Sequence, residues 1–156
     1  SSNQKIDLIT PLHRTGGIVG GVMAIKLGVI PILPVQFKHS PENILQISDL
    51  PNMLIDIPTN PNILFCEGNT SGGSVSKKAA KLIKEKYPNS KIYLATLTKV
   101  YGGPNEIEGI EKIFYGVLTN ENYKATDDEV EKIGLRKGIT IFPCEKEEDE
   151  LSELNN

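Results

Sequence analysis

The chain has 156 residues, which suits a single domain with a hydrophobic core of its own. Hydrophobic residues make up 38% and charged residues 24%, and the net charge is −3, so the composition is typical of a globular protein and argues against a general nucleic-acid binder. No apolar run approaches the ~20 residues that a membrane span needs. Cys66 and Cys144 lie far apart without metal-ligand spacing, which fits a reducing, cytoplasmic setting.

The first half of the chain predicts short apolar strands around one helix. A strand is expected over residues 5–10, a loop over 11–17 and a strand over 30–37. Residues 18–27 are apolar at near-helical spacing and predict a buried helix that ends at Gly28. Residues 39–62 are rich in Pro, Asn, Ser and Asp. We expect a long excursion or a mobile hairpin there, because a structureless loop of this length is uncommon unless it is functional.

The second half alternates strands and helices, which favours a layered α/β domain. Residues 63–66 (ILFC) predict a buried central strand, and residues 75–87 predict an amphipathic helix. Three further strands are expected over residues 91–98, 113–118 and 138–142. Six acidic residues over 145–153 predict a solvated tail or terminal helix.

The sequence EGNTSGGS at residues 67–74 is the strongest local feature, because it lies between a buried strand and a helix. Gly72 and Gly73 let backbone N–H groups approach an anion, and the helix N-terminus adds unpaired donors. Hydroxyl groups come from Thr70, Ser71 and Ser74. The pattern favours a phosphate-binding loop. The alternative is a helix-capping turn with Ser71 or Ser74 as the N-cap.

Two other groups could act with this loop. Glu67 stands at the carboxyl end of its strand, where ligands bind in open α/β sheets, and its carboxylate could hold Mg²⁺ or sugar hydroxyls. A plain surface charge is the alternative for this residue. A second glycine pair, Gly16 and Gly17, follows the first strand, with Arg14 nearby to clamp an oxyanion. Two such loops suggest a ligand with phosphate at both ends.

Four stretches together resemble the type I phosphoribosyltransferases, and among them the bacterial xanthine-guanine and hypoxanthine enzymes. Residues 15–19 with 28–31 resemble the family's R-G-G loop, helix and next strand. Residues 63–74 resemble the strand and loop that bind 5-phosphoribosyl-1-pyrophosphate (PRPP). Residues 93–102 resemble the strand ending in the lysine that reads a purine's exocyclic oxygen, and residues 142–145 (FPCE) are similar to an F-P-W-E ending.

The resemblance implies a three-layer α/β domain over residues 1–145, with a mainly parallel central sheet, helices on both faces and a small C-terminal hood. Residues 146–156 would form an acidic tail. The implied reaction is Mg²⁺-dependent phosphoribosyl transfer from PRPP to a nucleobase, with a 6-oxopurine favoured, as in purine salvage. The implied partners are PRPP and the base, with no nucleic acid or membrane. Relatives often form dimers or tetramers, which leaves a homo-oligomer open.

The resemblance also implies roles for individual residues. Glu67 would face the ribose hydroxyls and Mg²⁺, with Thr70 at the neighbouring catalytic position. The residues for the 5′-phosphate would be Thr70, Ser71, Gly72, Gly73 and Ser74. The residues for the pyrophosphate would be Arg14, Thr15, Gly16 and Gly17. The residues for the base would be Lys99, Ile139 and Thr140. Residues 39–62 would close over the site as a flexible loop.

Two loop positions depart from the family pattern. Cys66 and Thr70 stand where its usual purine enzymes carry acids, and orotate enzymes also carry Thr at the second place. A Thr hydroxyl does not titrate near neutrality, so Thr70 is a poor general base. Two alternatives therefore stay open: a non-catalytic regulatory module that binds PRPP or a nucleotide, and an orotate or other pyrimidine phosphoribosyltransferase.

Overall fold

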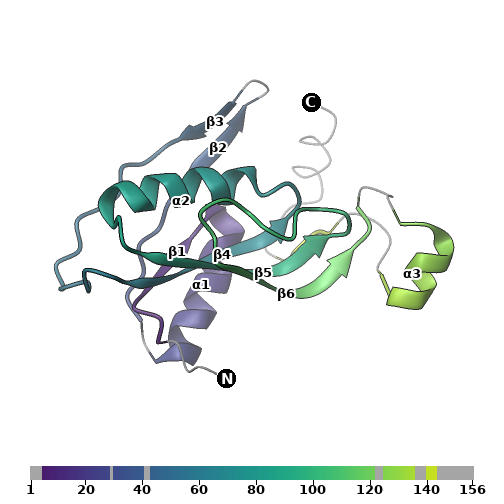
Figure 1. Cartoon of the computed structure of the whole chain (residues 1–156), viewed down its shortest axis with the longest axis horizontal. Helices are drawn as coiled ribbons and strands as arrows, with labels where there is room; N and C mark the ends of the chain where they lie inside the picture. Colours follow the sequence, from purple (N-terminus) through teal and green to yellow (C-terminus); the bar gives the residue numbers. More distant parts are fainter. Residues whose placement is uncertain (1–4, 29, 41–42, 122–124, 136–139, 144–156) are drawn as a thin grey trace.

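The computed structural model describes residues 5–28, 30–40, 43–121, 125–135 and 140–143. Its main sheet is parallel, with the strand order β1 (Leu8–Pro11), β4 (Asn62–Thr70), β5 (Lys91–Val100) and β6 (Lys112–Thr119) (Figure 1). An antiparallel hairpin is formed by β2 (Phe37–Ser40) and β3 (Asn43–Gln46). The helices in the described part are α1 (His13–Leu27), α2 (Ser74–Lys86) and α3 (Asp127–Ile133).

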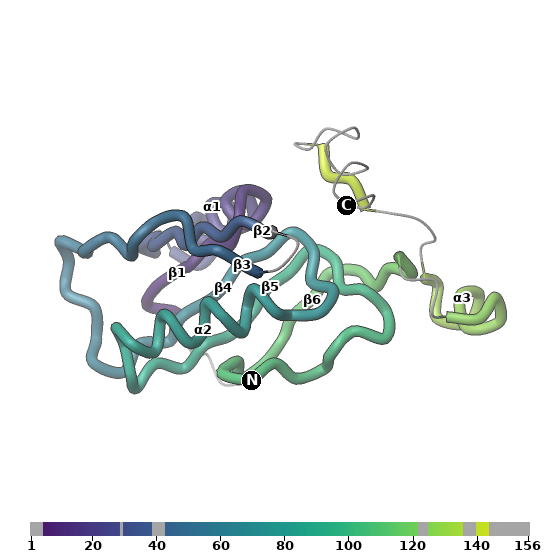
Figure 2. The backbone as a smooth tube through the Cα atoms, turned by 90° about the horizontal axis from the view of Figure 1, so that it is seen from above, coloured from purple at the N-terminus to yellow at the C-terminus, as the bar shows by residue number. Residues whose placement is uncertain are grey.

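Helices α1 and α2 pack on opposite faces of the sheet (Figure 2). The cluster on one face joins α2 to Ile63 and Phe65 of β4. The cluster on the other face joins α1 to Leu64 and Cys66 of the same strand. Successive side chains of a strand point to opposite faces, so β4 contributes to both clusters. The predicted three-layer α/β domain is confirmed.

Strand β4 is longer than the sequence predicts. Its pairing with β5 continues past residue 66, with Glu67 beside Thr96 and Thr70 beside Lys99. The prediction of a loop over residues 67–74 is therefore wrong, and only residues 71–73 separate β4 from α2. The predicted loop over residues 11–17 is also wrong, because α1 already begins at His13.

The predicted strand over residues 30–37 is wrong for most of its length. The segment runs beside β1 but makes only isolated bridges, at Ile32 and Val35. Pro31 and Pro34 have no N–H to donate, so a continuous ladder cannot form. From Phe37 the chain turns into the β2–β3 hairpin.

The excursion after this hairpin lies along α2. Leu50, Met53 and Ile57 pack against the core cluster on the α2 face. Lys86 of α2 also holds this segment, because its Nζ donates to the Pro51 carbonyl oxygen at 2.8 Å. Lys78 of the same helix donates to a carbonyl of β3 in the hairpin. These contacts give the excursion a packed position in the fold.

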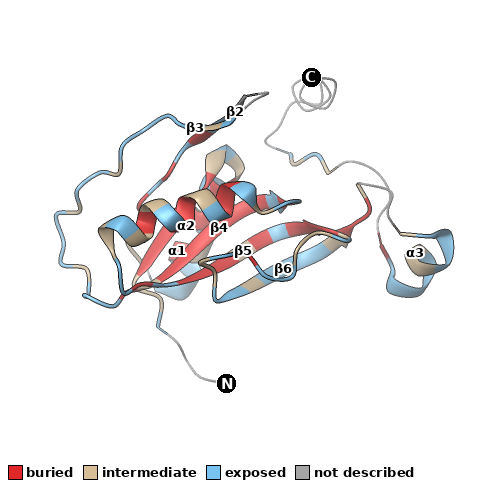
Figure 3. Ribbon diagram, turned by 45° about the horizontal axis from the view of Figure 1, so that its top comes forward, coloured by how far each residue is buried: buried red, intermediate tan, exposed pale blue. Residues whose placement is uncertain are grey.

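The carboxyl-terminal part differs more from the sequence prediction. Helix α3 lies apart from the sheet and was not predicted, although Thr126 and Glu129 form a capping box at its start. Strand β6 is largely exposed (Figure 3), which leaves Phe114 and Tyr115 each 48% exposed. Residues 140–142 are not a strand, and the rest of that predicted element and the acidic tail lie outside the described residues. In the described part of the chain, no helix has the length and apolar character to cross a membrane.

Candidate functional site

Helices α1 and α2 both begin at the carboxyl edge of the parallel sheet, where ligands bind in open α/β folds. The N-cap of α1 is Leu12 and that of α2 is Gly73. Neither N-cap makes a side-chain hydrogen bond to its helix. Because the first backbone N–H groups of a helix have no intrahelical partner, each first turn presents the positive end of its dipole at this edge.

The first turn of α1 rests directly on the backbone of β4. A Cβ atom on Gly16 would lie 2.2 Å from the carbonyl oxygen of Cys66, and a Cβ atom on Gly68 would lie 2.4 Å from Thr15 Cγ2. Glycine at both positions permits this close approach of helix and strand. At Gly17 no atom lies within 4 Å of an added Cβ, so the turn is open there. Arg14, beside it, is exposed.

His13, the first residue of α1, takes an unusual backbone conformation with φ of 61°. A left-handed conformation costs a residue with a Cβ roughly 1–2 kcal/mol. The ring lies against the hairpin, with Nδ1 3.1 Å from the carbonyl oxygen of Phe37. The contact ties the start of α1 to the start of β2, and no sequence pattern signals it.

The turn at residues 71–73 is open on one side and backed on the other. An added Cβ at Gly72 would meet nothing within 4 Å. Gly73 has φ of 73°, and its Cβ would lie 2.6 Å from Ile107 Cδ1. The alternative of a helix cap made by Ser71 or Ser74 is wrong, because the N-cap is Gly73. The hydroxyls of both serines are therefore not used as caps.

Glu67 and Thr70 are brought together, but both side chains are buried. Glu67 is 5% exposed and Thr70 is 2% exposed. Thr70 Oγ1 donates to Glu67 Oε2 at 2.5 Å, and Ser76 Oγ donates to Glu67 Oε1 at 2.6 Å. The alternative that Glu67 is a plain surface charge is wrong. Ser76, which the sequence analysis does not single out, is part of the same group.

The described residues do not form a magnesium site made of protein ligands alone. Mg²⁺ prefers oxygen ligands, commonly one or two carboxylates together with substrate phosphates. Within the described residues, no three or more His, Cys, Asp or Glu side chains are grouped to hold a metal. Glu67 is the carboxylate at this edge that the sequence predicts as a ligand, and both of its oxygens accept hydrogen bonds from hydroxyls.

Lys99 lies beside Thr70 across the β4–β5 pairing and is only 5% exposed. Its Nζ donates to Asn105 Oδ1 at 3.0 Å and lies 5.7 Å from the centroid of the Tyr115 ring. Both of these partners are uncharged groups. In this structure the side chain is engaged by the 103–105 turn.

The segment at residues 140–143 returns to the same edge. Glu121 bridges it to β4, because its Oε1 accepts from the Thr140 backbone N–H and its Oε2 accepts from Asn69 Nδ2, both at 3.0 Å. Phe142 lies nearby, since a Cβ on Gly68 would come 3.0 Å from its Cε2. Thr140 therefore joins the candidate site, whereas Ile139 lies outside the described residues. Sequence reasoning did not single out Glu121.

Cys66 is a packed core residue of β4, and we assign it no chemical role in the site. The residue is fully buried, and burial together with the neighbouring Glu67 raises the pKa of its thiol to about 12. A thiol with so high a pKa stays protonated near neutral pH and is a poor nucleophile.

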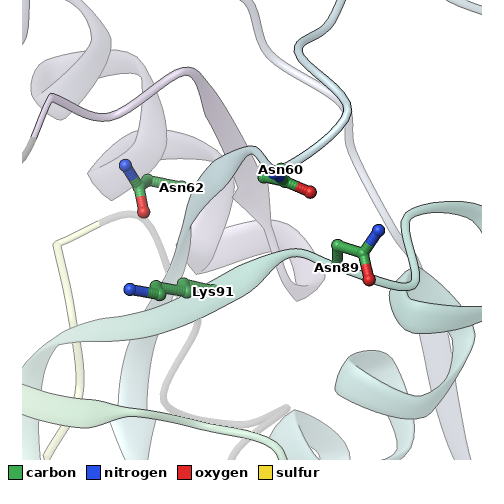
Figure 4. Close-up of a pocket in the computed structure, with 4 residues that line it drawn as sticks. All are labelled: Asn60, Asn62, Asn89 and Lys91. Atoms are coloured by element: carbon green, nitrogen blue, oxygen red, sulfur yellow. The ribbon is translucent and has the colours of Figure 1, made fainter.

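The opposite edge of the sheet carries a shallow polar hollow, which Figure 4 shows. Its lining residues are Asn60, Asn62, Asn89 and Lys91. They lie at the amino ends of β4 and β5, so the hollow is separate from the predicted phosphate-binding residues. It has no glycine turn and no helix N-terminus.

Comparison with known proteins identifies the fold. No family model matches the sequence, and no curated protein matches it. A purine phosphoribosyltransferase from Pyrococcus horikoshii matches with a TM-score of 0.60 at 17% identity, over 92% of this chain and 83% of that chain. An orotate phosphoribosyltransferase from Aeropyrum pernix matches with a TM-score of 0.57 at 13% identity, over 83% of this chain and 66% of that chain. The Helicobacter pylori xanthine-guanine-hypoxanthine phosphoribosyltransferase matches with a TM-score of 0.54 at 15% identity, over 71% of this chain and 75% of that chain.

These structures show that the chain has the fold of the type I phosphoribosyltransferases. The resemblance noted in the sequence is thus confirmed at the level of the fold. The matches include enzymes named for purines and enzymes named for orotate.

Proposed function

We propose that the protein transfers the phosphoribosyl group of PRPP to a nucleobase and releases pyrophosphate. One observation supports the proposal: two helix N-termini, each with open glycine backbone, lie at the carboxyl edge of the sheet in a phosphoribosyltransferase fold. PRPP carries a phosphate on C5 and a diphosphate on C1, so it suits a site with two positions for anions. The substrate would be the magnesium complex of PRPP.

The two ends of PRPP would bind to different helices. The diphosphate would lie against the first turn of α1, where the exposed Arg14 adds a guanidinium and Gly17 leaves room. The 5′-phosphate would lie at the turn of residues 71–74, with the open backbone at Gly72 and the hydroxyls of Ser71 and Ser74. The ribose would then lie across the end of β4.

The chemical step needs positioning more than a titrating side chain. A ring nitrogen of the base attacks C1, the bond from C1 to the diphosphate oxygen breaks with its electron pair on that oxygen, and the proton of the nitrogen passes to solvent. Positive charge develops on the ribose in the transition state, so holding both ends in line is the main contribution of the protein. Thr70 is a poor general base, because its hydroxyl does not titrate near neutrality.

The base would bind on the side of Lys99 and Thr140. A buried lysine with neutral partners can donate to the exocyclic oxygen of a 6-oxopurine if it turns from Asn105 toward the ligand. Thr140 is tied to the same edge through Glu121. The likeness of Lys99 and of residues 142–145 to the purine enzymes favours a 6-oxopurine over orotate. Glu67 is predicted as a ribose or metal ligand only by the sequence resemblance, and its buried, hydrogen-bonded carboxylate argues against that role.

A binding module without catalysis is the second candidate. It is favoured by one specific observation: the carboxylate of Glu67 is buried, and both of its oxygens are engaged. Such a module would bind PRPP or a mononucleotide at the same two helix ends and would not turn it over.

The two candidates are separated by incubating the protein with PRPP, Mg²⁺ and a panel of hypoxanthine, guanine, xanthine, adenine and orotate. We expect a nucleoside 5′-monophosphate and pyrophosphate in equal amounts with a 6-oxopurine. Tight PRPP binding with no nucleotide from any base would overturn catalysis and support the binding module. Absence of both binding and product would overturn the proposal altogether.

A further inference from the structure

The carboxylate of Glu67 joins the two ends of the turn at residues 71–73. Thr70, which precedes the turn, donates to one oxygen, and Ser76, in the first turn of α2, donates to the other. Ser76 itself is fully buried. The Glu67 side chain thus links the residue before the turn to the first turn of α2, beneath the proposed phosphate site.

We propose that Glu67 is a positioning residue that holds this turn in its phosphate-binding shape, and that it is not a ligand of the metal. The proposal rests on the proposed function in one respect, namely that the turn binds the phosphate of the substrate. It assigns Glu67 a role that differs from the one implied by the sequence resemblance.

Burial of the carboxylate is the first argument. A buried carboxylate is stable only when hydrogen bonds or charges compensate its lost hydration. Glu67 receives two short hydroxyl hydrogen bonds and lies under the first turn of α2, where the helix dipole favours a negative charge. Turning the side chain out to a ligand would break both bonds and leave the hydroxyl of Ser76 buried without this partner.

The composition of the turn is the second argument. Gly72 and Gly73 lose more backbone freedom on ordering than other residues, so a turn built on them needs external support. Ile107 and the turn at residues 103–104 pack against one side of the 71–73 turn. Glu67 holds both ends of the 71–73 turn through its hydrogen bonds with Thr70 and Ser76. A turn ordered in advance does not have to lose this freedom when the phosphate arrives, which strengthens binding.

The chemistry of the side chain gives a sharp distinction between two variants. In Glu67→Gln, the amide can still hold both hydroxyls, because its oxygen accepts and its NH₂ group donates to a hydroxyl oxygen. In Glu67→Ala both contacts are lost. A positioning role therefore predicts that Gln rescues what Ala loses, whereas a metal ligand would be impaired by both changes.

The experiment measures ribose 5-phosphate binding by calorimetry, since this probe carries the 5′-phosphate without the diphosphate. We expect Glu67→Ala to weaken binding by about tenfold or more and Glu67→Gln to stay within about threefold of the natural chain. Ser76→Ala, which removes one donor on the buried side of the helix, should weaken binding in the same direction. Glu85→Gln, an exposed acid on the same helix, is the matched control.

Two further measurements keep the outcomes distinct. The Mg²⁺ concentration that half-saturates PRPP binding should be the same for Glu67→Gln and the natural chain, and a clear increase would overturn the proposal in favour of a metal ligand. Amide hydrogen exchange at residues 71–74 in the ligand-free protein should rise about tenfold in Ser76→Ala or Glu67→Ala. Unchanged exchange would overturn the positioning role. If the natural chain itself does not bind ribose 5-phosphate, the proposed function fails, while the exchange still tests the positioning role.

Discussion

The two helix ends at the carboxyl edge of the sheet are built in different ways. The first turn of α1 lies directly on the β4 backbone through Gly16, and that turn carries no acid. The first turn of α2 is separated from β4 by a three-residue turn and has the buried Glu67 beneath it. The exposed Arg14 adds a positive charge at the end of α1, whereas a carboxylate lies beneath the end of α2, which suits the more highly charged diphosphate at α1.

The reactivity of the Cys66 thiol tests whether α1 covers β4, because this side chain lies in the cluster between them. Of these predictions, this one has the largest expected effect. Its pKa of about 12, against 9.0 for a free thiol, makes the thiolate about 1,000-fold scarcer at pH 8. In a Cys144→Ser chain, a thiol reagent should modify Cys66 only after unfolding. Because the folded state holds this proton more tightly, the free energy of unfolding should fall as the pH rises from 9 toward 12. Rapid labelling of the folded protein would show that α1 does not cover the strand.

Gly16→Val tests the contact of α1 with β4 itself. The new Cβ would lie 2.2 Å from a backbone oxygen that cannot move aside, so the helix must shift. We expect the free energy of unfolding in urea to fall by about 3 kcal/mol or more. Gly17→Ala is the control: its Cβ meets nothing, and alanine favours the helix by up to ~1 kcal/mol. Equal stability of both variants would contradict the packing described here.

Arg14→Ala tests the assignment of the diphosphate to α1. Removing the guanidinium should weaken PRPP binding by about tenfold, because a charge-assisted contact is lost, and should leave ribose 5-phosphate binding unchanged. Lys26→Ala, at the other end of the same helix, should change neither. If Arg14→Ala weakens the binding of PRPP and of ribose 5-phosphate equally, the diphosphate and the 5′-phosphate do not bind at separate helix ends as proposed.

The strands and helices with clear periodicity could be predicted from the sequence. Helix α2 and strands β5 and β6 were found because their apolar residues recur at the helical or strand period. The end of β4 was missed, because Glu67, Gly68, Asn69 and Thr70 resemble a loop in composition. Their strand conformation comes from pairing with β5, which is distant in the sequence.

The site was predicted as a set of residues but not as a geometry. Arg14 and the turn at residues 71–74 do lie at one edge, as the order of strands and helices predicts. The contacts of Glu67 with Ser76, of Glu121 with Thr140 and of His13 with β2 depend on tertiary packing, so no local pattern indicates them. The capping box of α3, formed by Thr126 and Glu129, is by contrast a local sequence pattern that indicates a helix start.

The central claim is that PRPP binds at the carboxyl edge of the sheet, between the ends of α1 and α2. Titration of the ¹⁵N-labelled protein with PRPP and Mg²⁺, followed through the backbone amide signals, tests it most directly. We expect the largest shifts at residues 14–17 and 71–76, with none at Asn60, Asn62, Asn89 and Lys91 around the opposite hollow. Shifts confined to that hollow, or no shifts at either helix end, would contradict the account.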